Sequence, residues 1–95
     1  MDLQVRHDEK KKRFVAEVEG RECALDYERL DDRTLEYHHT FTPEPLRRRG
    51  IMSEVVGYAL DWAARNDHRV VATCPFVKGY VERHPETRKV VTRAA

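Results

Sequence analysis

The sequence has few cysteines and no long apolar run. Only two of its 95 residues are cysteines, Cys23 and Cys74, and they lie far apart without a Cys-x-x-Cys spacing. That scarcity argues against a zinc site and against a disulfide-stabilised secreted scaffold, so we expect two free thiols. No apolar run approaches the roughly 20 residues that span a bilayer, and the first residues lack the features of a signal peptide. We therefore expect a cytoplasmic protein without membrane contact.

An excess of charge of either sign is also missing. The 18 basic residues nearly balance the 17 acidic ones, for a net charge of +1, whereas general nucleic-acid binders usually need a clear basic excess. Disordered chains usually combine low hydrophobicity with a large net charge, which does not fit this chain. His38 and His39 are adjacent, but no second cluster at ligand spacing accompanies them, so no metal is expected. The length predicts one domain over residues 1–95, as a monomer or weak homodimer.

Alternating apolar and charged residues predict strands in the first half of the chain. Four segments fit this pattern, around residues 3–7, 13–19, 22–28 and 34–41. The fourth segment places four residues on one face, which we predict to face the core: Leu35, Tyr37, His39 and Phe41. The pattern therefore predicts an antiparallel meander of four strands.

The pattern changes after Pro43 and Pro45, which stop the last of these strands. Apolar residues at helical spacing predict a helix over 50–66, and the apolar run at 69–73 predicts a buried strand. Pro75 can open a second helix ending before Pro85. Residues 87–95 would form either an edge strand or, over 88–95, a loose tail. The fold class is therefore α/β (α+β), a mixed sheet with helices covering at least one face.

The loop before the longer helix carries three consecutive arginines, Arg47, Arg48 and Arg49, followed by Gly50. Helix N-termini present unpaired amides and the positive end of a dipole, which favours a bound phosphate group. Glycine lets the backbone approach a ligand closely. The alternatives are a solvated basic cluster or a small module that binds nucleic acid or protein through these arginines.

Two side chains could take part in chemistry near this loop. Cys74 ends the apolar strand beside a helix start, a setting that favours the thiolate form of cysteine, so it could accept an acyl group; otherwise it is a small buried side chain. His39 is of the side-chain type that titrates near neutral pH and could act as a base. The alternative for His39 is a buried structural histidine.

Three stretches together resemble the small, minimal members of the GCN5-related N-acetyltransferase (GNAT) superfamily: His39 to Pro43, Leu46 to Ile51 and Cys74 to Glu86. The resemblance covers about half of the chain. It implies a minimal GNAT-like fold, with acetyl-CoA as co-substrate and its pyrophosphate on the cofactor-binding segment Arg47, Arg48, Arg49, Gly50, Ile51 and Met52. The family pattern there is Arg or Gln, two residues, Gly, one residue, then Gly or Ala. Arg47 and Gly50 match it, Met52 stands at the small position, and Arg48 stands where these small proteins usually have Gly.

The resemblance also implies acetyl transfer to a primary amine of unknown identity, in a small molecule or a protein lysine. Tyr80 would protonate the departing CoA thiolate, and Lys78 could reach a CoA phosphate. Either His39 deprotonates the attacking amine or Cys74 is acetylated first. Acidic residues could attract a cationic amine, among them Glu36, Glu44 and Glu82. The alternative function is a CoA-binding protein with little or no turnover, because Met52 departs from the pattern and the chain is short.

Overall fold

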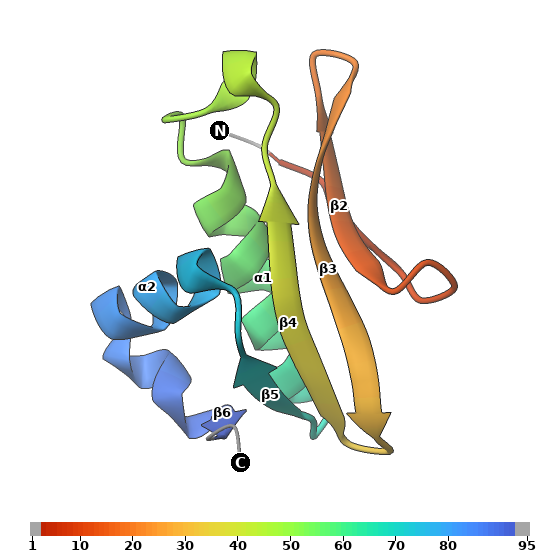
Figure 1. The fold of residues 1–95 in the computed structure, drawn as a ribbon, viewed down its shortest axis with the longest axis vertical. Helices are drawn as coiled ribbons and strands as arrows, with labels where there is room; N and C mark the ends of the chain where they lie inside the picture. Colours follow the sequence, from red (N-terminus) through yellow and green to blue (C-terminus); the bar gives the residue numbers. More distant parts are fainter. Residues whose placement is uncertain (1–2, 93–95) are drawn as a thin grey trace.

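The computed structural model describes residues 3–92, which form a six-stranded sheet and two α-helices (Figure 1). The elements follow the chain in this order: β1 (Val5–Asp8), β2 (Arg13–Val18), β3 (Arg21–Asp31), β4 (Thr34–Phe41), α1 (Ile51–Arg65), β5 (Arg69–Ala72), α2 (Pro75–Arg83) and β6 (Val91–Thr92). Short 3₁₀ turns lie at Glu44–Leu46 (η1) and Pro85–Lys89 (η2). Strands β1 to β4 are antiparallel neighbours, whereas β5 is parallel to β4 and β6 is parallel to β5. The predicted meander and mixed sheet are confirmed.

The core lies between the sheet and α1, which runs behind β4 in Figure 1. The apolar face of α1 is buried through Val55, Val56, Ala59, Leu60 and Ala63. It packs against Phe14, Leu25 and Tyr37, and the Tyr37 hydroxyl donates to the Ala59 carbonyl at 2.7 Å. Burying each large side chain of this kind stabilises the fold by about 2 kcal/mol. The other face of β2 to β4, toward the viewer in Figure 1, has no helix over it in the described part of the chain and is called the open face below.

The predicted core position of His39 is wrong, because a β-bulge interrupts β4. Tyr27 pairs with Tyr37 but Asp26 pairs with His39, so His38 is an extra residue in the ladder. One inserted residue reverses the alternation of side chains beyond it. His39 is consequently exposed on the open face, and Phe41 is 50% exposed. Thr40 takes the place on the helix side that the alternation had assigned to His39.

The end of the chain follows the edge-strand alternative. Val91 and Thr92 pair with Val70 and Val71 of β5, and the side chain of Val90 is buried in the core cluster. Residues 88–92 are therefore not a loose tail, because the η2 turn brings them back to the sheet. Residues 93–95 of the expected tail lie outside the described residues.

One half-buried histidine links β1 to α1. His7 stacks on Phe14 with ring centroids 4.1 Å apart, and its Nε2 lies 2.6 Å from the Tyr27 hydroxyl oxygen. The indole of Trp62 meets the imidazole edge-on at 4.5 Å. Burial is the main cause that lowers the pKa of His7 below its ordinary value. The Glu9 and Asp8 charges oppose this lowering and outweigh the Arg29 and His68 charges that add to it, so burial decides the direction of the shift.

This lowered pKa makes stability depend on pH. Below about pH 6.5 the unfolded chain protonates His7 more readily than the folded protein does, so acidification favours unfolding. We expect His7→Gln, which cannot titrate there and keeps an acceptor for Tyr27, to flatten the fall in unfolding free energy between pH 7.5 and 5. Urea titrations at several pH values measure this unfolding free energy. The same slope in both proteins would contradict the role given to His7, since the other four histidines are common to both.

Candidate functional site

Strands β4 and β5 separate after Tyr37 and Ala72. Their parallel pairing runs from Thr34 and Arg69 to Tyr37 and Ala72. The amides of Thr73 and Cys74 then both donate to the Tyr37 carbonyl, at 3.2 and 3.1 Å. Strand β4 continues to Phe41, so within residues 3–92 its last four residues have no strand neighbour on that side. An edge of this kind offers backbone donors and acceptors to a ligand.

A cleft of about 400 Å³ lies beside this edge. Thr40 and Phe41 line it from β4, Arg48 and Gly50 from the loop before α1, and Phe76 from α2. The cleft thus extends from the first turn of α1 to the end of β4 and the start of α2. Its polar end contains the loop, and its apolar walls include two exposed aromatic side chains, Phe41 and Phe76.

The loop end of the cleft is suited to an anion. Gly50 is the N-cap of α1 at φ 78°, and no side chain caps the helix. The first intrahelical bond joins the Glu54 amide to the Gly50 carbonyl at 3.3 Å, which leaves the amides of residues 51–53 without intrahelical acceptors. A Cβ added at Gly50 would meet nothing within 4 Å, and residues 50–53 line the cleft. A phosphate group fits there.

The three arginines of the loop have different surroundings. Arg47 Nε donates to the Thr42 carbonyl at 2.8 Å, which ties the loop to the end of β4. Arg48 lines the cleft and has a left-handed backbone conformation at φ 66°. Arg49 turns to Glu19, with Nη2 2.9 Å from the carboxylate oxygen Oε2. The sequence grouped all three as cofactor-binding residues, whereas the structure brings Arg47 and Arg48 to the cleft and pairs Arg49 with the β2–β3 turn.

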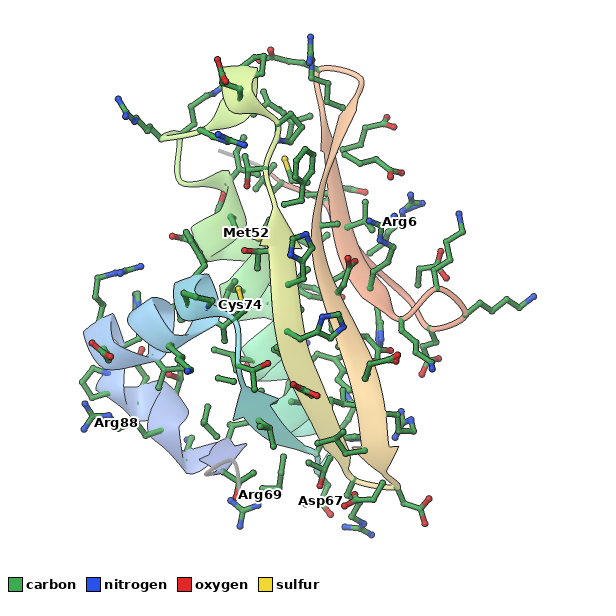
Figure 2. The ribbon with its side chains drawn as sticks, viewed as in Figure 1. Arg6, Met52, Asp67, Arg69, Cys74 and Arg88 are labelled. Atoms are coloured by element: carbon green, nitrogen blue, oxygen red, sulfur yellow. The ribbon has the colours of Figure 1, made fainter. Side chains whose placement is uncertain are left out.

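The next two residues, Ile51 and Met52, belong mainly to the core. Their side chains are 1% and 5% exposed, and both pack in the main apolar cluster while lining one wall of the cleft. Met52, labelled in Figure 2, therefore places most of its bulk among core residues. A long side chain is accommodated here because α1 turns this position toward the sheet.

Cys74 lies at the start of α2 next to β4 (Figure 2). Its side chain is 4% exposed, and Sγ is 3.4 Å from the Thr40 hydroxyl oxygen. The Cys74 carbonyl accepts the Lys78 amide at 3.0 Å in the first turn of α2. The thiol and the Thr40 hydroxyl thus meet across the gap between β4 and α2. The sequence pattern could not find Thr40, because the bulge at His38 decides which way it points.

The open face carries the groups that could meet an amine. His39 lies opposite Asp26 there. Glu36 is half-buried beside β5, and its carboxylate accepts the Thr73 hydroxyl at 2.8 Å. Glu28 of β3 lies directly opposite Glu36 of β4. Two like charges in this arrangement do not favour stability. From the sequence, Glu36 was one acidic residue among several; its bond to the residue next to Cys74 separates it from the others.

Tyr80 and Lys78 do not line this cleft. The Tyr80 ring stacks on His84 with centroids 3.9 Å apart. Its hydroxyl lies 2.7 Å from the Cβ that an alanine at position 57 of α1 would add, so Gly57 leaves room for it. Burial, followed by the Glu86 charge, raises the pKa of Tyr80. Lys78 is exposed and lines a different cleft, of about 440 Å³, together with Thr73 and residues of β6. The roles implied for these two residues stay predictions.

Two further findings concern what the described residues do not form. Residues 3–92 bring together no group of three or more His, Cys, Asp or Glu side chains that could hold a metal ion. Neither of their helices has the length and apolar character needed to cross a membrane.

The fold has a known counterpart. It is similar to the solution structure of a GCN5-like protein from Staphylococcus aureus, with a TM-score of 0.74 over 98% of this chain and 91% of that one. The two sequences are 18% identical, so this likeness concerns the fold. The sequence model of the GCN5-related N-acetyltransferase family matches residues 13–90. The chain therefore belongs to this family.

Curated relatives extend over most of the chain. The chain is 32% identical over 85 residues to Protein NATD1 of Gallus gallus, covering 87% of this chain and 77% of that protein. It is 29% identical to Protein NATD1 of Homo sapiens over the same share of this chain and 75% of the relative. The family match includes β2 to β5, both helices and the loop at Arg47 to Gly50.

Proposed function

We propose that the protein transfers an acetyl group from acetyl-CoA to a primary amine. The observation that carries this proposal is the cleft that extends from the glycine-capped start of α1 to the end of β4 and the start of α2. The amides of residues 51–53 and the Arg48 guanidinium would hold the pyrophosphate. The unpaired edge of β4 would bond the amide groups of the pantetheine arm, and the acetyl end would reach Thr40 and Cys74.

The amine approaches from the open face of the sheet in this proposal. Glu36 pairs with Val71 of β5 and accepts a hydrogen bond from Thr73, and it would hold the substrate while it is still an ammonium ion. His39, directly or through water, takes the proton that the nitrogen must lose before it attacks the acetyl carbonyl. The carbon–sulfur bond then breaks, and CoA leaves as a thiolate that must be protonated. Tyr80 is the predicted donor of that proton.

A covalent route through Cys74 uses the same cleft. The Cys74 thiolate would attack the acetyl carbonyl, release CoA and later yield the acetyl group to the amine. Rapid quenching with labelled acetyl-CoA distinguishes the routes, because only this one places label on Cys74 before an amine is added. We expect no such label, since Cys74 is 4% exposed and its Sγ lies 3.4 Å from the Thr40 hydroxyl oxygen.

Calorimetry with CoA tests the proposal directly, followed by a panel of amines with labelled acetyl-CoA. We expect CoA binding and transfer to at least one amine. Absence of any heat or thermal shift with CoA would overturn the family-based function for this chain. The second candidate, a CoA-binding protein with little or no turnover, is favoured by one observation: the Tyr80 hydroxyl faces Gly57 rather than the cleft. Binding without transfer to any amine would support it.

Arg48 gives a prediction in which stability and binding change in opposite directions. A residue with a side chain at φ 66° costs about 1 kcal/mol relative to glycine, yet this side chain lines the cleft. Arg48→Gly should therefore raise the unfolding free energy by up to about 1 kcal/mol while weakening CoA binding roughly tenfold. Chemical denaturation and calorimetry measure the two. A stabilised variant with unchanged affinity would show that Arg48 does not contact the cofactor.

A further inference from the structure

A tight turn at the end of the β2–β3 hairpin stands beside the loop before α1 (Figure 1). It consists of Glu19 and Gly20, with φ values of 52° and 75°, between the paired residues Val18 and Arg21. Two successive residues at positive φ between paired strands define a type I′ turn, which matches the twist of the hairpin and has little freedom. The turn is therefore a rigid attachment point for a side-chain contact from a neighbouring loop.

One side-chain contact attaches the loop to this turn. Arg49 Nη2 lies 2.9 Å from Glu19 Oε2, between residues 30 positions apart in the sequence. Arg49 sits between two residues at positive φ, Arg48 and the N-cap Gly50. Within residues 3–92, the side chains of this loop make one other hydrogen bond, from Arg47 to the Thr42 carbonyl. The Glu19–Arg49 ion pair thus secures the half of the loop nearest to α1.

From these contacts, and resting on the acetyl-CoA function proposed above, we infer that Glu19 and Arg49 are positioning residues for the cofactor. Their ion pair draws Arg49 away from the cleft, and the loop then presents Arg48 and the first amides of α1 to the diphosphate. Arg49 does not touch the cofactor in this account. Its side chain is 39% exposed and that of Glu19 is 61% exposed, so the expected effects are several-fold rather than hundred-fold.

Charge exchange separates positioning from direct binding. Glu19→Gln and Arg49→Gln should each weaken CoA binding about three- to fivefold in low salt, and Arg49→Glu should weaken it further. The exchanged pair, Glu19→Arg with Arg49→Glu, should restore affinity to within about twofold of the natural protein. Moderate salt should reduce these differences, because the pair is exposed. Asp67→Asn breaks the exposed ion pair of Arg33 with Asp67, which lies outside the proposed cofactor cleft, and should leave CoA affinity unchanged.

The opposite pattern would overturn the inference. If Arg49 bound the diphosphate itself, the exchanged pair would stay as weak as Arg49→Glu, and Glu19→Gln would tighten binding by releasing a cation to the ligand. An unchanged CoA affinity in every variant would also overturn the inference.

A measurement without ligand keeps this inference separate from the proposed function. Amide hydrogen exchange at residues 54–56, the first hydrogen-bonded amides of α1, should accelerate in Glu19→Gln and recover in the exchanged pair, while exchange in β2 stays unchanged. If the natural protein fails to bind CoA while these variants still change the exchange, the proposed function fails but the ion pair keeps its role in holding the loop. If the natural protein binds CoA but exchange is unaffected by these variants, the ion pair is not a positioning device.

Discussion

Gly50→Val should reduce the affinity for CoA by at least about 100-fold, equivalent to about 2.7 kcal/mol. Gly50 is the N-cap of α1, and the space around its missing Cβ is empty of protein atoms within 4 Å. A branched side chain there would stand between the amides of residues 51–53 and the pyrophosphate. It would also force a valine into φ 78°, at a cost of about 1–2 kcal/mol to the folded state. Calorimetry with CoA and urea denaturation measure the two losses separately.

Gly20→Val is the matched control. Gly20 has φ 75° and also has nothing within 4 Å of an added Cβ, but it lies in the β2–β3 turn outside the cleft. Both variants should lose similar stability. The control should lose no more CoA affinity than Glu19→Gln does, because it acts only through the neighbouring ion pair. Equal affinities for the two valine variants would show that the pyrophosphate does not sit at Gly50.

Local patterns in the sequence were sufficient to predict most of the fold. Alternation found β2, β3 and β4 because one face of each strand packs on the core and the other carries most of its charged side chains. Helical spacing found α1 because its buried residues, from Ile51 to Ala63, recur on one side. Pro75 marked the start of α2 correctly. The position of Gly50 and the arginines at the start of α1 was also predictable, whereas anion binding there stays a prediction.

The site itself depended on contacts that no local pattern contains. The bulge at His38 arises from the pairing of β4 with β3, and it moved His39 to the open face and Thr40 toward Cys74. The ion pair of Arg49 joins residues 30 positions apart. Tyr80 has the right spacing along α2, but its packing against Gly57 is decided by how α1 and α2 meet.

The bulge also provides the means to test the proposed base. It leaves His38 and His39 both exposed on adjacent positions of β4, so they form a matched pair of substitutions. His39→Gln should lower kcat about 100-fold, within the range that a general base usually contributes, while the KM for acetyl-CoA stays constant because His39 is outside the cofactor cleft. His38→Gln should leave kcat within about twofold. Steady-state kinetics with the best amine of the panel provides both values.

The pH dependence distinguishes a proton acceptor from a residue that only supports the strand. If His39 accepts the proton, His39→Gln should change the shape of the profile of kcat against pH. A merely structural effect of the substitution would lower stability and leave the shape of the profile intact. If His39→Gln keeps full activity while Glu36→Gln loses it, the proton goes to Glu36. The Glu36 carboxylate already accepts a hydrogen bond at 2.8 Å from the hydroxyl of Thr73, the residue before Cys74.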